Sequence, residues 1–282
     1  MIIATRNGIL RLEWRNREWV VTNRFAESHD IRSVSAQGET VLAGGKAGLF
    51  RSEDGGRNWA EADDGLTVPY VRWVTFHPDG SGRVFAGTEP AAIFLSEDGG
   101  VTWSERPEVA RLRDRHAWSL PYSPRAGCVR GFAAHGARVY AAVEQGGLLR
   151  SDDRGESWRF VEGACRGPDE KPDGRSLHAD VHSVLVHPSS PDLVFAPTGG
   201  GFYRSENGGA TWDFLYDCYC RACWVDPADP QHIVLGPADD VSRNGRIEES
   251  RDGGQTWVDA STPLATPWPE EMIEWFVPVE DM

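Results

Sequence analysis

Short apolar runs alternate with polar, glycine-rich segments along the chain. Runs such as "GGLLR" (146–150) and "GGGFYR" (199–204) are each followed by an eight-residue polar segment that ends in tryptophan. Apolar runs of this length, bounded by turn residues, are typical of strands rather than helices. The pattern therefore predicts many short strands joined by hairpins, and an all-β fold.

The polar segment occurs in five similar copies, roughly 45 to 55 residues apart, a spacing typical of β-propellers. Its acid and paired glycines suit a tight hairpin that needs positive φ angles. The copies are "SEDGGRNW" (52–59), "SEDGGVTW" (96–103), "SDDRGESW" (151–158), "SENGGATW" (205–212) and "SRDGGQTW" (250–257).

The repeated segment resembles the Asp-box, or BNR, repeat of sialidases, sortilin-like receptors, some xyloglucanases and the photosystem II assembly factors. This resemblance implies a β-propeller in which each Asp-box forms the hairpin between the third and fourth strands of a blade. In that family the hairpins lie away from the ligand-binding face. The resemblance therefore implies a fold and says little about activity.

A sixth, altered copy near the N-terminus completes the count of blades. "GILRLEWRNREW" (8–19) aligns without a gap with "GLFRSEDGGRNW" (48–59), so the chain begins at the second strand of that blade. We expect "MIEWFVPVEDM" (272–282) to supply the innermost strand and so protect an open sheet edge. The sequence thus predicts one six-bladed propeller domain over residues 1–282, with the first blade closed by the C-terminal strand. The predicted blades are residues 272–282 with 1–23, then 30–61, 70–105, 128–161, 180–214 and 219–259.

The composition of the chain limits the kinds of partner that it can bind. The formal net charge of −14 argues against a nucleic-acid surface, which needs concentrated lysine and arginine. No apolar run approaches membrane-spanning length, and the N-terminus "MIIATRNGIL" lacks the apolar stretch of a signal peptide. We therefore expect a soluble, cytoplasmic protein without a membrane partner. Its five cysteines, an odd number, do not suggest a disulfide framework.

The starts of the predicted innermost strands form a second repeated column. Because these strands begin at the ligand-binding face, their third residues are expected to gather at the channel mouth. Several guanidiniums there would repel one another unless carboxylates or a bound anion countered them. We predict that the arginines bind an anionic small molecule or sugar; the alternative is that each pairs with a carboxylate such as Asp30, Asp180 or Glu274. The column contains Arg32, Arg72, Arg130, His182, Arg221 and Glu274.

Loops between the second and third strands return to the same face. They carry Glu89 and Glu144, which are candidate general acids or bases, or simply solvated turn acids. If the site is catalytic, His182, Glu144 or Glu274 would transfer the protons. The long connection 106–127 is expected to wall the site, and its Trp118 either stacks on a ligand or anchors the loop.

The resemblance to sialidases implies three arginines on a substrate carboxylate and a Tyr–Glu nucleophile pair. Tyr219 or Tyr70 would supply the tyrosine and Glu274 its partner. The Arg-Ile-Pro motif of that family is absent, and "IRSV" and "VRWV" are the nearest segments. We therefore do not expect sialidase activity, and Tyr219 remains a predicted ligand-binding residue.

Two segments raise the question of a metal. "HADVH" (178–182) and the three thiols of "CYCRAC" (218–223) do not match a four-ligand structural zinc pattern. The sequence predicts no metal site and identifies no cofactor, although it leaves metal binding by His178, His182 or the cysteines open. The preferred hypothesis is a propeller that binds an anionic small molecule or glycan, with or without glycosidase-like hydrolase or lyase activity. The alternative is a non-enzymatic scaffold for a protein partner.

Overall fold

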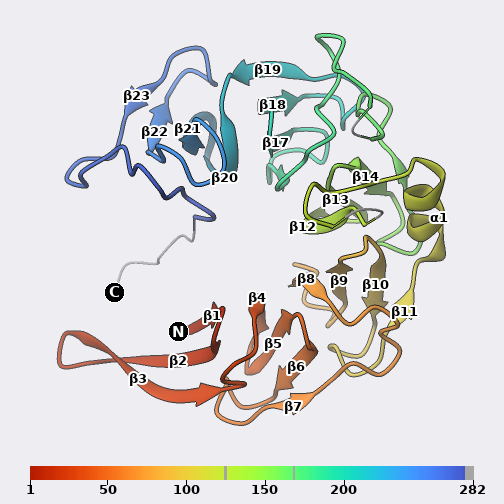
Figure 1. The fold of residues 1–282 in the computed structure, drawn as a ribbon, viewed down its shortest axis with the longest axis vertical. Helices are drawn as coiled ribbons and strands as arrows, with labels where there is room; N and C mark the ends of the chain where they lie inside the picture. Colours follow the sequence, from red (N-terminus) through yellow and green to blue (C-terminus); the bar gives the residue numbers. More distant parts are fainter. Residues whose placement is uncertain (124–125, 168, 277–282) are drawn as a thin grey trace. The chain divides into compact units, whose positions relative to one another are not determined.

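The computed structural model describes residues 1–123, 126–167 and 169–276, and antiparallel sheets dominate them (Figure 1). One sheet has three strands and five have four, and in each the neighbouring strands follow one another in sequence. Such meanders are the blades of a β-propeller. The sheets consist of β1 (Ile2–Thr5), β2 (Gly8–Arg15) and β3 (Glu18–Phe25); β4 (Ile31–Gln37), β5 (Thr40–Gly45), β6 (Gly48–Ser52) and β7 (Ala60–Glu61); β8 (Val71–Phe76), β9 (Val84–Thr88), β10 (Ile93–Ser96) and β11 (Ser104–Glu105); β12 (Cys128–His135), β13 (Arg138–Glu144), β14 (Gly147–Ser151) and β15 (Arg159–Phe160); β16 (Leu185–Val186), β17 (Val194–Thr198), β18 (Gly201–Ser205) and β19 (Asp213–Tyr216); and β20 (Tyr219–Asp226), β21 (Asp229–Ala238), β22 (Glu248–Ser250) and β23 (Val258–Asp259).

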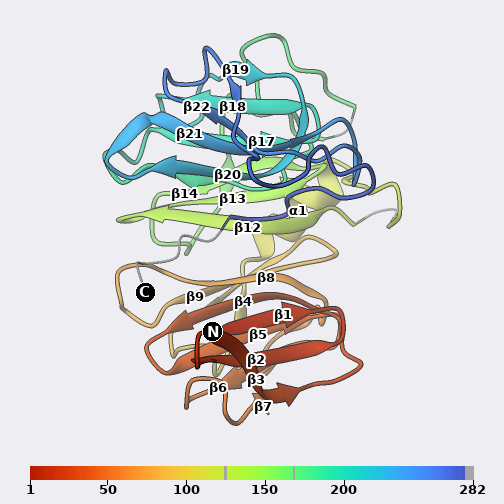
Figure 2. The same ribbon diagram turned by 90° about the vertical axis from the view of Figure 1, so that its left-hand side faces the viewer.

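The chain divides into two compact units. Unit 1 contains Met1–Val139 and Ser151–Arg159, and unit 2 contains Tyr140–Arg150 and Phe160–Met282. Within unit 1, β4 packs against β1 and β8 (Figure 2), and within unit 2, β20 packs against β17 and β18. Each unit therefore buries its apolar residues between the faces of neighbouring sheets.

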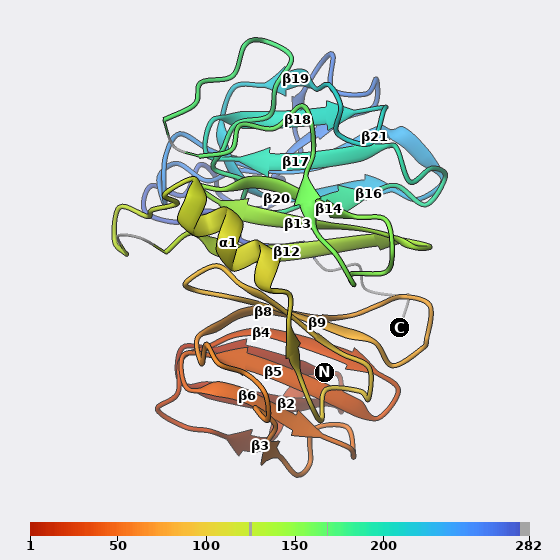
Figure 3. The same ribbon diagram turned by 90° about the vertical axis from the view of Figure 1, so that its right-hand side faces the viewer.

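The long connection after β11 contains α1 (Pro107–Arg115), a helix that the sequence analysis did not predict (Figure 3). Pro107 occupies the first turn, where its missing N–H costs no hydrogen bond. The side chain of Glu108, also in the first turn, accepts a hydrogen bond from the backbone N–H of Trp158 at 3.0 Å. Near the other end, Arg113 donates to the carbonyl of Ala91 at 3.2 Å. These contacts fix the connection to unit 1.

All five polar segments form the hairpin between the third and fourth strands of a sheet, as predicted. In each, the first serine accepts a hydrogen bond from the backbone N–H four residues later at 2.8–2.9 Å. The third residue, an aspartate or Asn207, accepts one from the N–H four residues beyond it at 2.8–3.0 Å. The turn between them needs left-handed backbone, as at Gly99 and Gly100 with φ angles of 76° and 85°. The repeat is therefore accounted for by hairpin geometry.

The first sheet has three strands, β1, β2 and β3. Strands β1, β2 and β3 correspond to the second, third and fourth strands of a blade, and the altered copy forms a tight hairpin with positive φ angles at Asn16 and Arg17. At the other end, residues 270–276 carry no strand, so an innermost strand is not present there. Residues 277–282 lie outside the described residues. Closure of the first blade by the C-terminal segment remains a prediction.

Acid is expected to weaken the hairpins through their aspartates. Burial raises the pKa of Asp98, but hydrogen bonds from Thr102, Ser96 and Val101 outweigh this and lower the pKa to about 2. Because the folded-state pKa lies below the unfolded value of about 3.9, this stabilisation is present above about pH 4 and is lost as the pH falls toward about 2. Asp98→Asn keeps a hydrogen-bond acceptor at this position, as Asn207 does in another copy, but it removes the ionisable carboxylate. Between about pH 5 and pH 2.5, its urea-unfolding midpoint should therefore fall less than that of the wild type. An equal drop would contradict this assignment, and Glu97→Gln on the exposed surface is the control.

Candidate functional site

In unit 1, the column residue Arg72 belongs to a compact group of three side chains. Its guanidinium carbon lies 5.2 Å from the centre of the Tyr70 ring, and its Nη1 lies 3.3 Å from the Tyr70 hydroxyl. The same nitrogen forms an ion pair with Glu89, which lies in the loop between β9 and β10. The Arg72 and Glu89 side chains are only 12% and 8% exposed. This pair is therefore enclosed and fixed in place.

Arg32, also in unit 1, shares one carboxylate with a lysine. Arg32 pairs with Asp30, and Nζ of Lys46 lies 3.3 Å from the same carboxylate. Nε of Arg32 is buried without a hydrogen-bond partner. The sequence analysis did not name Lys46, although it lies in a loop between second and third strands and so on the expected face. Arg32 and Lys46 carry two positive charges and share the single negative charge of Asp30. One positive charge is therefore left to attract an anion.

Unit 2 repeats the arrangement seen around Arg72. The guanidinium carbon of Arg221 lies 5.4 Å from the centre of the Tyr219 ring, Nη2 donates to the Tyr219 hydroxyl at 2.9 Å, and Nη1 pairs with Glu274. Burial lowers the pKa of Arg221, but Glu274 and Tyr219 outweigh this and raise it, so the guanidinium stays charged. Nε of Arg221 is buried without a hydrogen-bond partner. We call each such group of three residues a Tyr–Arg–Glu module.

The two modules differ in the exposure of the glutamate. Glu89 is 8% exposed, whereas Glu274 is 58% exposed. An enclosed carboxylate cannot leave its arginine without large rearrangement, whereas an exposed one exchanges with solvent at little cost. Arg221 is therefore the arginine whose partner a ligand can most readily replace. The pairs at Arg32, Arg72 and Arg221 correspond to the alternative that the sequence left open, in which the arginines pair with carboxylates.

Glu144, Asp180 and His182 of unit 2 lie close together, and we call them the acid–histidine cluster. One possible ligand atom from each of Glu144, Asp180 and His182 lies within 4.8 Å of the others. The His182 ring is completely buried, with Nδ1 2.8 Å from the carbonyl oxygen of Cys220 and Nε2 3.2 Å from a carboxylate oxygen of Asp180. The predicted strand 180–184 is not continuous, because Val181 forms only an isolated bridge. The sequence placed these residues on one face and considered Asp180 and His182 together in the segment "HADVH", but it did not join Glu144 to them.

The structure also describes the remaining predicted residues. Arg130 lies in β12, and Trp118 is completely buried beside Gly127, a location that favours anchoring over ligand stacking. Burial lowers the pKa of His178, whose Nδ1 accepts the backbone N–H of Asp180 at 3.1 Å. All five cysteines are free thiols. A hollow of about 560 Å³ in unit 1 is lined by Arg51, Asp54, Trp59 and other hairpin residues, but by none of the modules.

Two curated proteins resemble part of the chain. They are xyloglucanases from Hypocrea jecorina (strain QM6a), 22% identical over 184 residues, and from Paenibacillus sp, 28% identical over 157 residues. The matches cover 61% and 43% of this chain but only 21% and 15% of the two enzymes. The chain thus spans about a fifth or less of their length. No protein-family model matches the chain.

Similarity to solved structures identifies the fold of the chain. An ancestral GH74 enzyme superposes with a TM-score of 0.66 at 18% identity, over 84% of this chain and 32% of that one. YCF48 from Cyanidioschyzon merolae superposes with a TM-score of 0.65 at 18% identity, over 94% and 81%. The chain is a β-propeller. A structure of YCF48 bound to D1 peptide matches this propeller with a TM-score of 0.60 at 18% identity, over 93% and 78%. Among the described residues of the propeller, no helix has the length and apolarity that a membrane crossing requires.

Proposed function

We propose that this propeller is a binding protein that recognises a polypeptide segment by a carboxylate, with Arg221 as the contact. The observation that supports this most is the exposed Glu274, which pairs with Nη1 of a guanidinium whose Nε has no hydrogen-bond partner. A ligand carboxylate that displaces Glu274 gains a charge-assisted contact with a guanidinium already oriented by the Tyr219 ring. The site is therefore preorganised for a carboxylate.

The extent of the structural matches favours a peptide as the ligand. This chain and YCF48 match over most of both chains, and one YCF48 structure contains a bound D1 peptide. The GH74 match covers only a third of that enzyme. One of the candidate proton-transfer residues also fits catalysis poorly, because the His182 side chain is completely buried. Fold similarity at this identity does not supply a function, so the proposal depends on the module itself.

The preferred carboxylate can be identified with an array of ten-residue peptides that have free C-termini. Each is compared with the same peptide amidated at its C-terminus and with a peptide that lacks acidic side chains. We expect Arg221→Gln to bind the selected peptide at least about tenfold more weakly in fluorescence polarisation, because a charge-assisted hydrogen bond contributes about 1.5–3 kcal/mol. Arg204→Gln, the same change on β18 outside the modules, should leave the Kd unchanged. Equal affinities of the wild type and Arg221→Gln would contradict the proposal.

A glycan-active enzyme is the second candidate, supported by the xyloglucanase matches and by the proximity of Glu144 and Asp180. Two carboxyl groups about 5 Å apart suit retaining glycoside hydrolysis. Turnover of xyloglucan oligosaccharides that is lost in Glu144→Gln would replace the peptide proposal with this one. Thermal-shift measurements with sialic acids, uronic acids and phosphosugars test the remaining hypothesis, a small anion at the arginines.

A further inference from the structure

We propose that Glu144, Asp180 and His182 form a binding site for a first-row divalent transition-metal ion, with Zn²⁺ as the ion that fits best. The sequence predicted no metal site but left metal binding by His178, His182 or the cysteines open, and it did not consider Glu144 as a ligand. The residues that converge are Glu144, Asp180 and His182, with their possible ligand atoms within 4.8 Å of one another. This inference goes beyond peptide binding and does not depend on it.

The orientation of His182 is the first argument. Its Nδ1 lies 2.8 Å from the carbonyl oxygen of Cys220, and a carbonyl only accepts hydrogen bonds, so Nδ1 carries the hydrogen. In the neutral ring, Nε2 then presents its lone pair to the cluster. Metal-binding histidines are typically fixed in this way, with the other ring nitrogen donating to a backbone carbonyl. Because Cys220 lies in β20, a sheet strand holds the ring in this orientation.

The groups that face Nε2 of His182 also favour a metal ion. In the neutral ring, Nε2 of His182 and Oδ2 of Asp180 are both acceptors and lie 3.2 Å apart, so a cation between them would bind both. The Glu144 carboxylate is also buried in this cluster. A divalent ion at this point would bind the nitrogen lone pair of His182 together with both carboxylates.

The donor set indicates the kind of ion. One imidazole nitrogen with two carboxylates favours Zn²⁺ and its first-row neighbours over Mg²⁺ and Ca²⁺, which prefer all-oxygen sites. Around a tetrahedral Zn²⁺ the ligand atoms would lie roughly 3.4 Å apart, close to the 3.2 Å between His182 and Asp180. Three protein ligands would leave a coordination position open. The Tyr219 hydroxyl lies 3.3 Å from Nε2, so the cluster adjoins the Arg221 module.

The test uses the full chain, stripped with EDTA and dialysed. We expect it to bind one equivalent of Zn²⁺ in isothermal titration calorimetry, and Co²⁺ to give visible absorption bands of a low-symmetry site. His182→Gln and Glu144→Gln should each weaken Zn²⁺ binding at least about tenfold. His232→Gln is the matched control, because His232 lies in the same unit between Asp226 and Glu249 but outside the cluster.

Two results would overturn the proposal. One is no Zn²⁺ or Co²⁺ binding by the wild-type chain. The other is binding that both His182→Gln and Glu144→Gln retain, which would place the ion elsewhere. Far-UV circular dichroism establishes that each variant is folded, and Glu144→Gln remains informative if His182→Gln does not fold. Binding is measured without any peptide or sugar, so failure of the peptide proposal would not affect it.

Discussion

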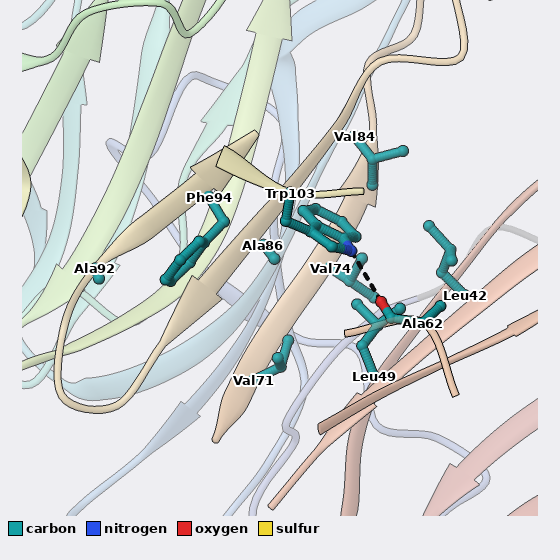
Figure 4. Packing of buried hydrophobic residues seen from close by; sticks show 10 residues of the cluster. All are labelled: Leu42, Leu49, Ala62, Val71, Val74, Val84, Ala86, Ala92, Phe94 and Trp103. Atoms are coloured by element: carbon teal, nitrogen blue, oxygen red, sulfur yellow. Dashed lines mark hydrogen bonds between the residues drawn. The ribbon is translucent and has the colours of Figure 1, made fainter. Parts of the chain in front are cut away.

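Replacing Trp103 by alanine is expected to lower the free energy of unfolding by about 3–5 kcal/mol. The ring is only 6% exposed and packs with Leu42, Leu49 and Phe94 in one apolar cluster (Figure 4). Its Nε1 donates to the carbonyl of Ala62 at 2.9 Å, so a residue of one hairpin connects two neighbouring sheets of unit 1. Truncation would leave a large cavity and a carbonyl without its donor.

Urea unfolding followed by far-UV circular dichroism measures this effect without depending on tryptophan fluorescence. Trp103→Phe should lose less stability, because it keeps most of the apolar volume. Val101→Ala, on the exposed side of the same hairpin, should change stability by less than about 0.5 kcal/mol. If Trp103→Ala unfolds at the wild-type midpoint, the repeated tryptophan does not connect the sheets energetically.

Removing the carboxylate charge beside Arg72 should destabilise the protein almost as much. Glu89→Gln leaves a guanidinium that is 12% exposed without its counter-charge, which typically costs about 3–5 kcal/mol. The expected loss is large because neither water nor another carboxylate can easily replace the enclosed partner. The same urea titration measures it.

The structure offers two controls for this prediction. Glu53 pairs with Arg51 in the same unit but is 75% exposed, so Glu53→Gln should cost less than about 1 kcal/mol. The double variant Arg72→Met/Glu89→Gln should recover much of the loss, because it removes the stranded charge. A Glu89→Gln variant as stable as Glu53→Gln would mean that the Arg72 module is not enclosed in solution.

The hairpins were predictable because their geometry is local. Serine, aspartate and glycine at fixed offsets satisfy the turn within eight residues, so the sequence alone located all five. The repeated arginines were also predictable, because the predicted innermost strands begin with similar residues. The sequence missed α1, although Pro107 and Glu108 are typical of a helix N-terminus, because the connection was considered only as a loop.

The sequence named Asp30 and Glu274 among the possible partners of the arginines but did not assign them, because some partners come from distant parts of the chain. Glu274 reaches Arg221 from 53 residues away, and the Cys220 carbonyl orients His182 from 38 residues away. Several carboxylates were available to each arginine, and only the folded backbone selects among them. The predicted strand at 180–184 forms only the isolated bridge between Val181 and Thr198, and β16 begins after it at Leu185.

Carboxylate recognition at Arg221 can be observed on Arg221 itself. In a ¹H–¹⁵N spectrum of the arginine Nε–Hε groups, the Arg221 signal is assigned by its loss in Arg221→Gln. We expect this signal to shift progressively and saturate when a selected peptide with its carboxylate is added, and the matched peptide without the carboxylate to leave it in place. A peptide that binds while the Arg221 signal stays unchanged would show that recognition takes place elsewhere on the propeller.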